Sequence, residues 1–185
     1  ELDLYVHEAR DQRMLVENTE PPALVVPASL QKLREMEIAF AIARLVARVA
    51  MRSWLIDKLT ATNLEDLVYA AFSLGYGPAP KQRAADVEDL ARRLARVLSR
   101  KARRQIDEVV PRAQHFDARA LVKALDQGCS RAAWLVTGDL VSALDHLRRL
   151  EMARDPEAVR VEPTRPDSQT GELIRFALSA EGGVL

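Results

Sequence analysis

The sequence has few of the features on which several classes of protein depend. Its 185 residues include one cysteine, Cys129, which excludes a disulfide framework and a multi-cysteine metal site. Lys plus Arg and Asp plus Glu number 27 each, so no overall charge directs the chain to nucleic acid or membrane. No apolar run approaches the length of a membrane span, and the N-terminus has no signal-peptide pattern. We therefore expect a cytoplasmic protein without a membrane partner.

The usual catalytic motifs are also missing. There is no glycine-rich phosphate loop, no G-x-S-x-G, no paired-cysteine zinc signature and no H-E-x-x-H. The histidines, His7, His115 and His146, are scattered, and none has a second His or Cys at ligand spacing. Cys129 stands among small residues of a predicted helix, where a packed, inert thiol is expected. We expect no cofactor.

The order of elements predicts an α+β fold. A small N-terminal antiparallel sheet of about three strands packs on a mainly helical body of six to seven helices. We expect one domain over residues 1–185, with strands in 1–28, the helical body in 29–152, a loop in 153–169 and a C-terminal helix in 170–181. The chain starts inside a strand-like pattern without Met, which indicates a piece of a longer polypeptide.

The strand region has two distinguishing features. Residues 2–8 alternate in polarity and residues 13–17 follow after a short polar link, which predicts a hairpin. Residues 23–27 are a third strand, and the prolines at both its ends favour an edge position. An open edge there would accept an extended peptide through Ala23, Leu24, Val25 and Val26. The alternative is an edge covered by the loop at 75–82.

The stretch from Ser29 to Arg52 is the longest predicted helix. Ser29 is its expected N-cap, and no Gly or Pro interrupts the residues that follow. Apolar residues occupy most of its circumference, which predicts a central position in the fold. Four charged residues interrupt this pattern on one narrow face: Glu37, Arg44, Arg48 and Arg52.

Further helices are predicted from their caps and apolar spacing. Thr62 and Glu65 form a capping box, and Asp117 caps a later helix that runs to Gly138. Amphipathic spacing predicts further helices at 84–100, 140–150 and 171–178. The first of these opens a basic stretch, which could contact phosphates. Acidic flanks and the lack of interleaved aromatics favour a solvated helical face instead; its cations are Arg92, Arg93, Arg96, Arg100, Lys101, Arg103 and Arg104.

Three stretches together resemble the gluzincin zinc metallopeptidases of the HtpX and CAAX-prenyl-protease type. Residues 18–30 (NTEPPALVVPASL) resemble the strand pair and lead-in to the active-site helix of that family. Residues 40–51 (FAIARLVARVAM) are similar to its H-E-x-x-H helix, and residues 126–150 (DQGCSRAAWLVTGDLVSALDHLRRL) to its downstream E-x-x-A-D-R helix.

The resemblance assigns the family's catalytic positions to named residues. Arg44 and Arg48 stand at the two zinc-ligand histidines, Leu45 at the general-base glutamate, and Asp126 at the third ligand. Cys129 and Ser130 replace the alanine and aspartate of the downstream motif, and Arg131 matches its arginine. Because a guanidinium cannot ligate zinc and leucine cannot take a proton from water, the resemblance implies a degenerate, catalytically inactive domain.

Such domains resemble the C-terminal modules of bacterial tetratricopeptide-repeat proteins, which implies a protein-interaction or structural module whose partners are proteins or flanking domains. We expect Asp126, with Glu37 as a second candidate, to pair with Arg44 or Arg48 in place of the metal. The alternative is that the arginines only reach solvent. Two other functions stay open: a residual metal-dependent hydrolase using Asp126, His115 or His146, and a basic helical nucleic-acid-binding module.

Overall fold

The computed structural model describes residues 1–9, 13–74, 84–112, 116–154, 165 and 168–179. These residues form two compact units. Unit 1 combines Glu1–Asp57 with Lys123–Leu185, and unit 2 is the intervening Lys58–Val122. The expectation of a single domain over 1–185 stays a prediction, and each unit is described by itself below.

Unit 1 contains a three-stranded mixed sheet in the order β1-β3-β2. β1 (Asp3–His7) runs parallel to β3 (Ala23–Pro27), while β2 (Leu15–Glu17) runs antiparallel to it. The predicted antiparallel sheet is therefore mixed, and the predicted hairpin of residues 2–8 with 13–17 is wrong. β1 and β2 each form backbone hydrogen bonds with β3 and lie on its two opposite sides.

The position of β3 corrects a second prediction, that Ala23, Leu24, Val25 and Val26 form an open edge. β3 is the central strand, so its N–H and C=O groups pair with β1 on one side and β2 on the other. The flanking prolines bound the strand and do not interrupt its ladder, which leaves every N–H from residue 23 to 26 free to pair. The open edges of this sheet belong to β1 and β2.

The predicted helix at 29–52 is divided in the structure. Ser29 lies in a 3₁₀ helix, η1 (Ala28–Lys32), and not at an N-cap. The α-helix α1 (Glu35–Ala50) begins after Arg34, whose backbone N–H donates to the Glu37 carboxylate at 3.1 Å. Glu37 sits three residues after the cap, where a carboxylate satisfies a backbone donor that the helix leaves unpaired. With Arg34 in place of Ser29 as the N-cap, the helix starts five residues later than predicted.

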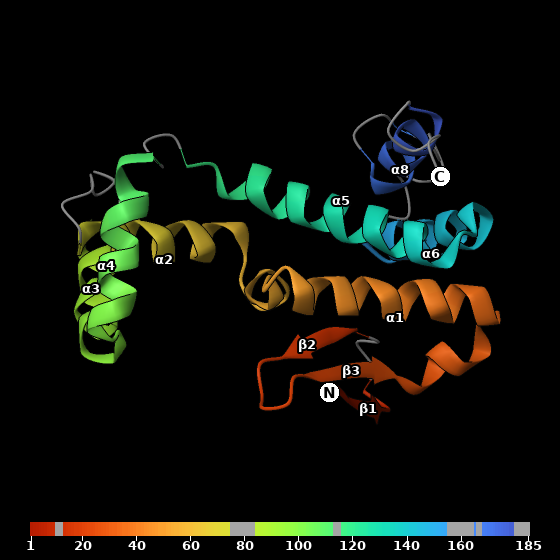
Figure 1. Ribbon diagram of the computed structural model, residues 1–185, viewed down its shortest axis with the longest axis horizontal. Coiled ribbons are helices and arrows are strands. Elements are labelled where there is room, and N and C mark those ends of the chain that lie inside the picture. The colour runs from red at the N-terminus through yellow and green to blue at the C-terminus, as the bar shows by residue number, and fades with distance from the viewer. Residues whose placement is uncertain (10–12, 75–83, 113–115, 155–164, 166–167, 180–185) are drawn as a thin grey trace. The chain divides into compact units, whose positions relative to one another are not determined.

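α1 is the central element of unit 1, as predicted (Figure 1). One face packs on the sheet in a core that includes Leu24, Val26 and Leu45. The opposite face packs through Phe40 on a second core. That core combines residues of α5 (Ala118–Thr137), α6 (Leu140–Arg154) and α8 (Gln169–Leu178): Ala133, Ala143, Leu147 and Leu173.

Unit 2 is helical. It contains α2 (Ala61–Ser73), α3 (Ala84–Val97), α4 (Arg100–Val109), the 3₁₀ helix η3 (Val110–Arg112) and the first residues of α5. α2 is capped by Thr60, which accepts from the N–H of Asn63 at 3.1 Å, so the predicted capping box on Thr62 is displaced. Asp117 caps α5 as predicted, accepting from the N–H of Ala120 at 3.0 Å. The predicted loop at 75–82 lies outside the described residues.

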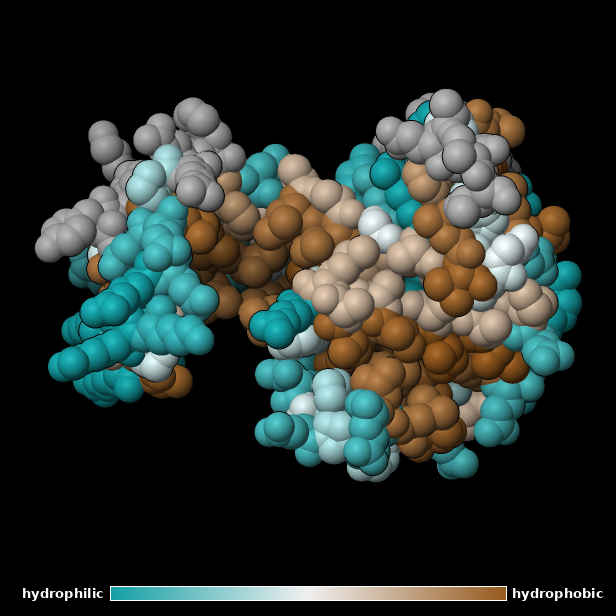
Figure 2. All heavy atoms as spheres, in the orientation of Figure 1, coloured by the Kyte–Doolittle hydropathy of each residue, from teal (hydrophilic) through white to brown (hydrophobic). Residues whose placement is uncertain are grey.

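The predicted fold class is confirmed with the sheet corrected from antiparallel to mixed: seven α-helices accompany the three strands in the part of the chain that the structure describes. None of those helices is both long enough and apolar enough to span a membrane. In Figure 2, hydrophobic residues gather over α1 and the sheet, whereas α3 and α4 present mainly hydrophilic residues.

Candidate functional site

A buried ion pair joins α1 to α5 in unit 1. Arg48 donates through Nη2 to Oδ1 of Asp126, and its Nε lies 3.1 Å from Oδ2 of Asp57. The Arg48 and Asp126 side chains are 8% and 10% exposed. Asp57 ends the 3₁₀ helix η2 (Trp54–Asp57), which follows α1. Two carboxylates from different elements therefore hold one guanidinium.

Arg44, one helical turn before Arg48, contacts the same carboxylate. Its Nη2 lies 3.6 Å from Oδ1 of Asp126, and the Arg44 side chain is 11% exposed. The predicted pairing of Asp126 with Arg44 and Arg48 is thus present, and both arginines point inward instead of reaching solvent. The spacing of four residues places both guanidinium groups on one face of α1, toward α5.

Gln169, the first residue of α8, also belongs to this cluster. Its Nε2 donates to Oδ2 of Asp126 at 2.6 Å, and its Oε1 accepts from Nη2 of Arg44 at 3.2 Å. The carboxylate of Glu151 on α6 fixes α8 there, because it accepts from the N–H groups of Gln169 and Thr170 at 2.6 and 3.2 Å. The Thr170 hydroxyl also donates to Glu151, at 2.8 Å.

Opposite charges meet in this cluster. Two positive charges, from Arg44 and Arg48, contact two negative charges, from Asp57 and Asp126. Their mutual attraction offsets part of the cost of removing these charged groups from water. Leu45 points away from the cluster into the core on the sheet side and is 5% exposed.

Cys129 lies beside this cluster as a packed thiol. It is fully buried, and its Sγ is 3.8 Å from Sδ of Met51. Burial raises the pKa of the Cys129 thiol, and the nearby arginines lower it only in part. The thiol is therefore protonated at neutral pH, which is unfavourable for a nucleophile. Ser130 is also buried, and its hydroxyl donates to the Asp126 carbonyl at 3.0 Å.

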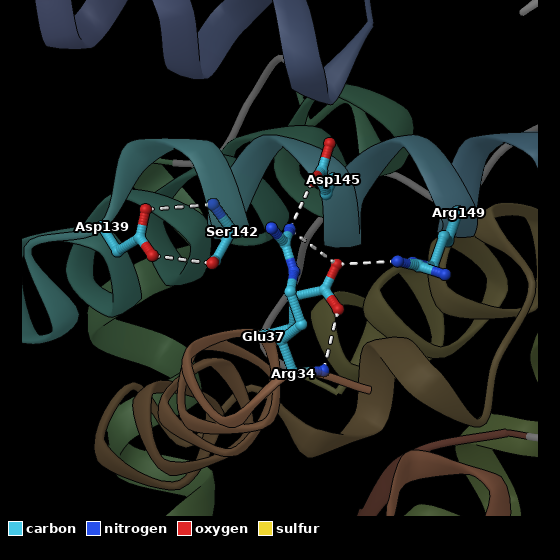
Figure 3. A network of polar contacts seen from close by, with 6 residues as sticks. All are labelled: Arg34, Glu37, Asp139, Ser142, Asp145 and Arg149. Carbon is cyan, nitrogen blue, oxygen red and sulfur yellow. Dashed lines mark hydrogen bonds and ion pairs between the residues drawn. The ribbon is translucent and has the colours of Figure 1, made fainter. Parts of the chain in front are cut away.

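Glu37 belongs to a separate polar network (Figure 3). Its fully buried carboxylate accepts from Nη2 of Arg149 at 2.8 Å and from the side chain and backbone of Arg34. Burial alone would raise the pKa of Glu37, but the hydrogen bonds from Arg149 and Arg34 outweigh it and lower the pKa. The prediction of Glu37 as a partner of Arg44 or Arg48 is corrected: Glu37 links α1 to α6 instead.

The two histidines in the described ranges, His7 and His146, contact residues outside the ion-pair cluster. His7 is in β1, where its Nε2 bonds the Arg13 carbonyl at 2.8 Å and its Nδ1 accepts from the N–H of Ala9 at 3.1 Å. His146 is 4% exposed on α6 and meets the Phe40 ring edge-on, with ring centroids 5.7 Å apart. Burial, and secondarily Arg44, lowers the pKa of His146 to about 4. His115 lies outside the described residues.

The arginines at the start of the basic stretch are exposed in unit 2. Arg92 and Arg93 of α3 are 71% and 74% exposed and pair with Asp89 on the same helix, at 3.6 and 2.7 Å. Arg103 of α4 donates to the Ala95 carbonyl. Intrahelical neutralisation of this kind is typical of a solvated face.

The residues at the four positions implied by the resemblance do not fit a zinc ion. Two are guanidinium groups, one is an aliphatic side chain, and the carboxylate is already held by arginines. Across the described ranges, no three His, Cys, Asp or Glu residues are grouped so that they could hold a metal. Comparison with protein families, curated proteins and solved structures returned no match to this chain.

Several members of these networks were missed by the sequence reasoning, among them Asp57, Gln169 and Arg149. Asp57 and Gln169 lie near element ends, where an acidic or amide residue is ordinary, so the sequence carries no signal for either role. Arg149 lies on the polar side of a predicted amphipathic helix, which reads as solvent-facing. For Glu37 the sequence did carry a signal of its role at the start of α1, because a carboxylate three residues after the N-cap is a capping pattern.

Proposed function

We propose that this chain is a catalytically inactive, metallopeptidase-like domain that serves as a protein-interaction or structural module of a larger bacterial protein in the cytoplasm. The observation that supports it best is the cluster of Arg44, Arg48 and Asp126. In the register of the resemblance these are three zinc-ligand positions, 78 residues apart between Arg48 and Asp126, and both arginine side chains contact the Asp126 carboxylate.

The chemistry of the cluster supports the loss of hydrolysis. Guanidinium groups stay protonated and would repel a metal cation. Leu45, at the general-base position, has no group that accepts a proton from water. The fixed positive charges of Arg44 and Arg48 take the electrostatic place of the divalent ion, and they tie α1 to α5. The proposed role of the cluster is to stabilise a scaffold.

The experiment tests the register and the inactivity separately. Metal content and peptidase activity are measured on the unmodified chain, where we expect neither zinc at one ion per chain nor hydrolysis. In a second arm the triple variant Arg44→His, Leu45→Glu, Arg48→His restores an H-E-x-x-H sequence. We expect this variant to gain zinc, because Asp126 then supplies a third ligand.

A matched control moves the same motif by one residue: Ala43→His, Arg44→Glu, Ala47→His. Both variants carry two histidines four residues apart on α1, so non-specific zinc binding by a helical His pair is the same in each. Zinc retention in the shifted control but not in the restored variant would show that the register is wrong. Stoichiometric zinc and hydrolysis in the unmodified chain would overturn the proposal and favour the metal-dependent hydrolase.

A further inference from the structure

The edge strand β1 exposes three consecutive apolar side chains. Leu4, Tyr5 and Val6 are 58%, 57% and 53% exposed. The register pairs Leu4 with Leu24 and Val6 with Val26, so these two share the face that packs on α1, and Tyr5 points to the opposite face. β1 therefore continues the apolar face of the sheet beyond the part that the core covers. An exposed apolar strand at a sheet edge is a pairing surface.

The backbone of β1 offers hydrogen-bonding groups on its outer side. The N–H of Asp3 donates to the Pro22 carbonyl at 3.0 Å, so the polar groups of Asp3 face β3. Along a strand, the backbone N–H and C=O groups of successive residues point to opposite sides. The backbone groups of Tyr5 and His7 therefore also face β3, and those of Leu4 and Val6 point outward, away from β3. Leu4 and Val6 thus combine outward-facing backbone groups with exposed apolar side chains, which lie on the face of the sheet that packs on α1.

These features are self-complementary in one antiparallel register. If β1 pairs with β1 of a second copy about Tyr5, all five residues of the strand are matched. Leu4 then faces the second copy's Val6, and each of the two exchanges both backbone hydrogen bonds with the other. Asp3 faces the imidazole of the second copy's His7, so the acidic side chain of the strand does not meet a like charge.

We propose that β1 is a self-association edge, through which two copies of this chain form a continuous six-stranded sheet in the order β2-β3-β1-β1-β3-β2. The inference rests on the proposed role as an interaction module and names a second copy as the partner. Both α1 helices would lie on the same face of that sheet, because the two-fold axis is perpendicular to it. Leu4 and Val6 of both copies would fill the strip between them.

The expected association is weak and reversible. One pair of five-residue strands buries much less than the roughly 1,200 Å² of a stable interface, so we expect dissociation constants between about 1 µM and about 1 mM. The test is sedimentation velocity of the 185-residue chain over that concentration range. We expect the sedimentation coefficient to rise with concentration toward that of a dimer.

Two variants localise the contact. Leu4→Lys with Val6→Lys places charges on the edge and should weaken dimerisation at least about tenfold. The matched control is Val136→Lys with Val141→Lys, which places the same two charges at other exposed apolar positions of unit 1 and should leave dimerisation unchanged. Circular dichroism of each variant checks that the chain is folded. A dimer that persists in the Leu4, Val6 variant overturns the assignment to β1.

Disulfide trapping tests the register. In a Cys129→Ala background, Tyr5→Cys places two thiols in a directly opposed pair, with Cα atoms about 4.5 Å apart, so oxidised glutathione should cross-link the copies. Leu4→Cys faces its own counterpart only diagonally, about 7–8 Å away, and should cross-link much more slowly. Equal rates at the two positions contradict the register about Tyr5.

A chain that stays monomeric throughout the concentration range overturns the self-association but leaves the zinc measurements on α1 unaffected. Conversely, zinc-dependent hydrolysis would overturn the proposed function without altering the state of association. The two failures are therefore distinguishable.

Discussion

Arg48 on α1 donates to Asp126 on α5 across 78 positions of sequence, and both side chains are about nine-tenths removed from solvent. Removing one partner of such a pair is destabilising, because the other charge is then left uncompensated in the interior. The neighbouring Arg44 depends on the same carboxylate.

We therefore expect Asp126→Asn to reduce the free energy of unfolding by about 3–5 kcal/mol, since it keeps the volume of the side chain but leaves two buried guanidinium groups with one carboxylate fewer. Urea denaturation followed by circular dichroism measures the change. The control is Asp89→Asn on α3, where a 2.7 Å pair with Arg93 is exposed and should contribute less than about 1 kcal/mol. Similar losses for the two variants would contradict a buried role for the Asp126 pair.

Glu37→Gln should also destabilise the chain, by about 2–4 kcal/mol, because the fully buried carboxylate caps α1 and accepts from Arg149. Glu35→Gln is the matched control, since Glu35 lies in the same first turn of α1 but is exposed. It should cost less than about 1 kcal/mol. Thermal unfolding at constant pH compares the two, and an equal effect would mean that Glu37 acts only through the helix dipole.

His146 should make the stability depend on pH. Its pKa is lowered to about 4 in the folded chain from 6.5, so between these values the unfolded chain binds a proton that the folded chain does not. The free energy of unfolding should therefore fall as the pH decreases from about 6.5 to about 4, by roughly 3 kcal/mol from this group alone.

Comparison with His146→Leu isolates that contribution, because Leu does not titrate and other acidic groups remain in both proteins. The advantage of the unmodified chain over His146→Leu should shrink as the pH falls through this window. The charged groups that influence His146 are Arg44, Glu37 and Arg149, so measurements at two salt concentrations check that burial is the main cause. A difference between the two proteins that stays constant with pH would contradict the lowered pKa.

Cys129 should be unreactive in the native chain, because its thiol is fully buried and its pKa is raised. We expect alkylation by iodoacetamide to be slow in buffer and complete in concentrated urea. The control is Val136→Cys in a Cys129→Ala background, which places the thiol on the same helix at a position that is 80% exposed. Equal alkylation rates at the two positions in native buffer would show that the Cys129 thiol is accessible.

The sequence predicted much of the local structure. The apolar circumference of residues 38–50 requires burial on two sides, and α1 is indeed packed between the sheet and the α5, α6 and α8 helices. The bounds of β3 and the cap at Asp117 follow from proline and Asx chemistry that acts within a few residues. Errors at Ser29 and Thr62 arose because several residues near a helix start can cap it, and tertiary contacts select one.

Strand order was decided by the tertiary structure. β3 has apolar residues on both faces and unbroken backbone donors, but nothing in its sequence states which strands take its two sides. The pairing of β1 and β2 with β3 instead of with each other depends on contacts between residues distant in sequence. This is why the open edge was assigned to β3 when it belongs to β1 and β2.

By itself, the sequence determined that Arg44, Arg48 and Glu37 lie on one side of a buried helix and that buried charges need partners, because helical spacing and desolvation are local properties. Only the tertiary structure decided which partners they have. In the folded chain, Asp126 pairs with the two arginines and Arg149 pairs with Glu37. Asp57 also contacts Arg48, and Gln169 also contacts Asp126. A charge requires compensation wherever it is buried, but which opposite charge reaches it depends on the packing of elements that the sequence does not order in space.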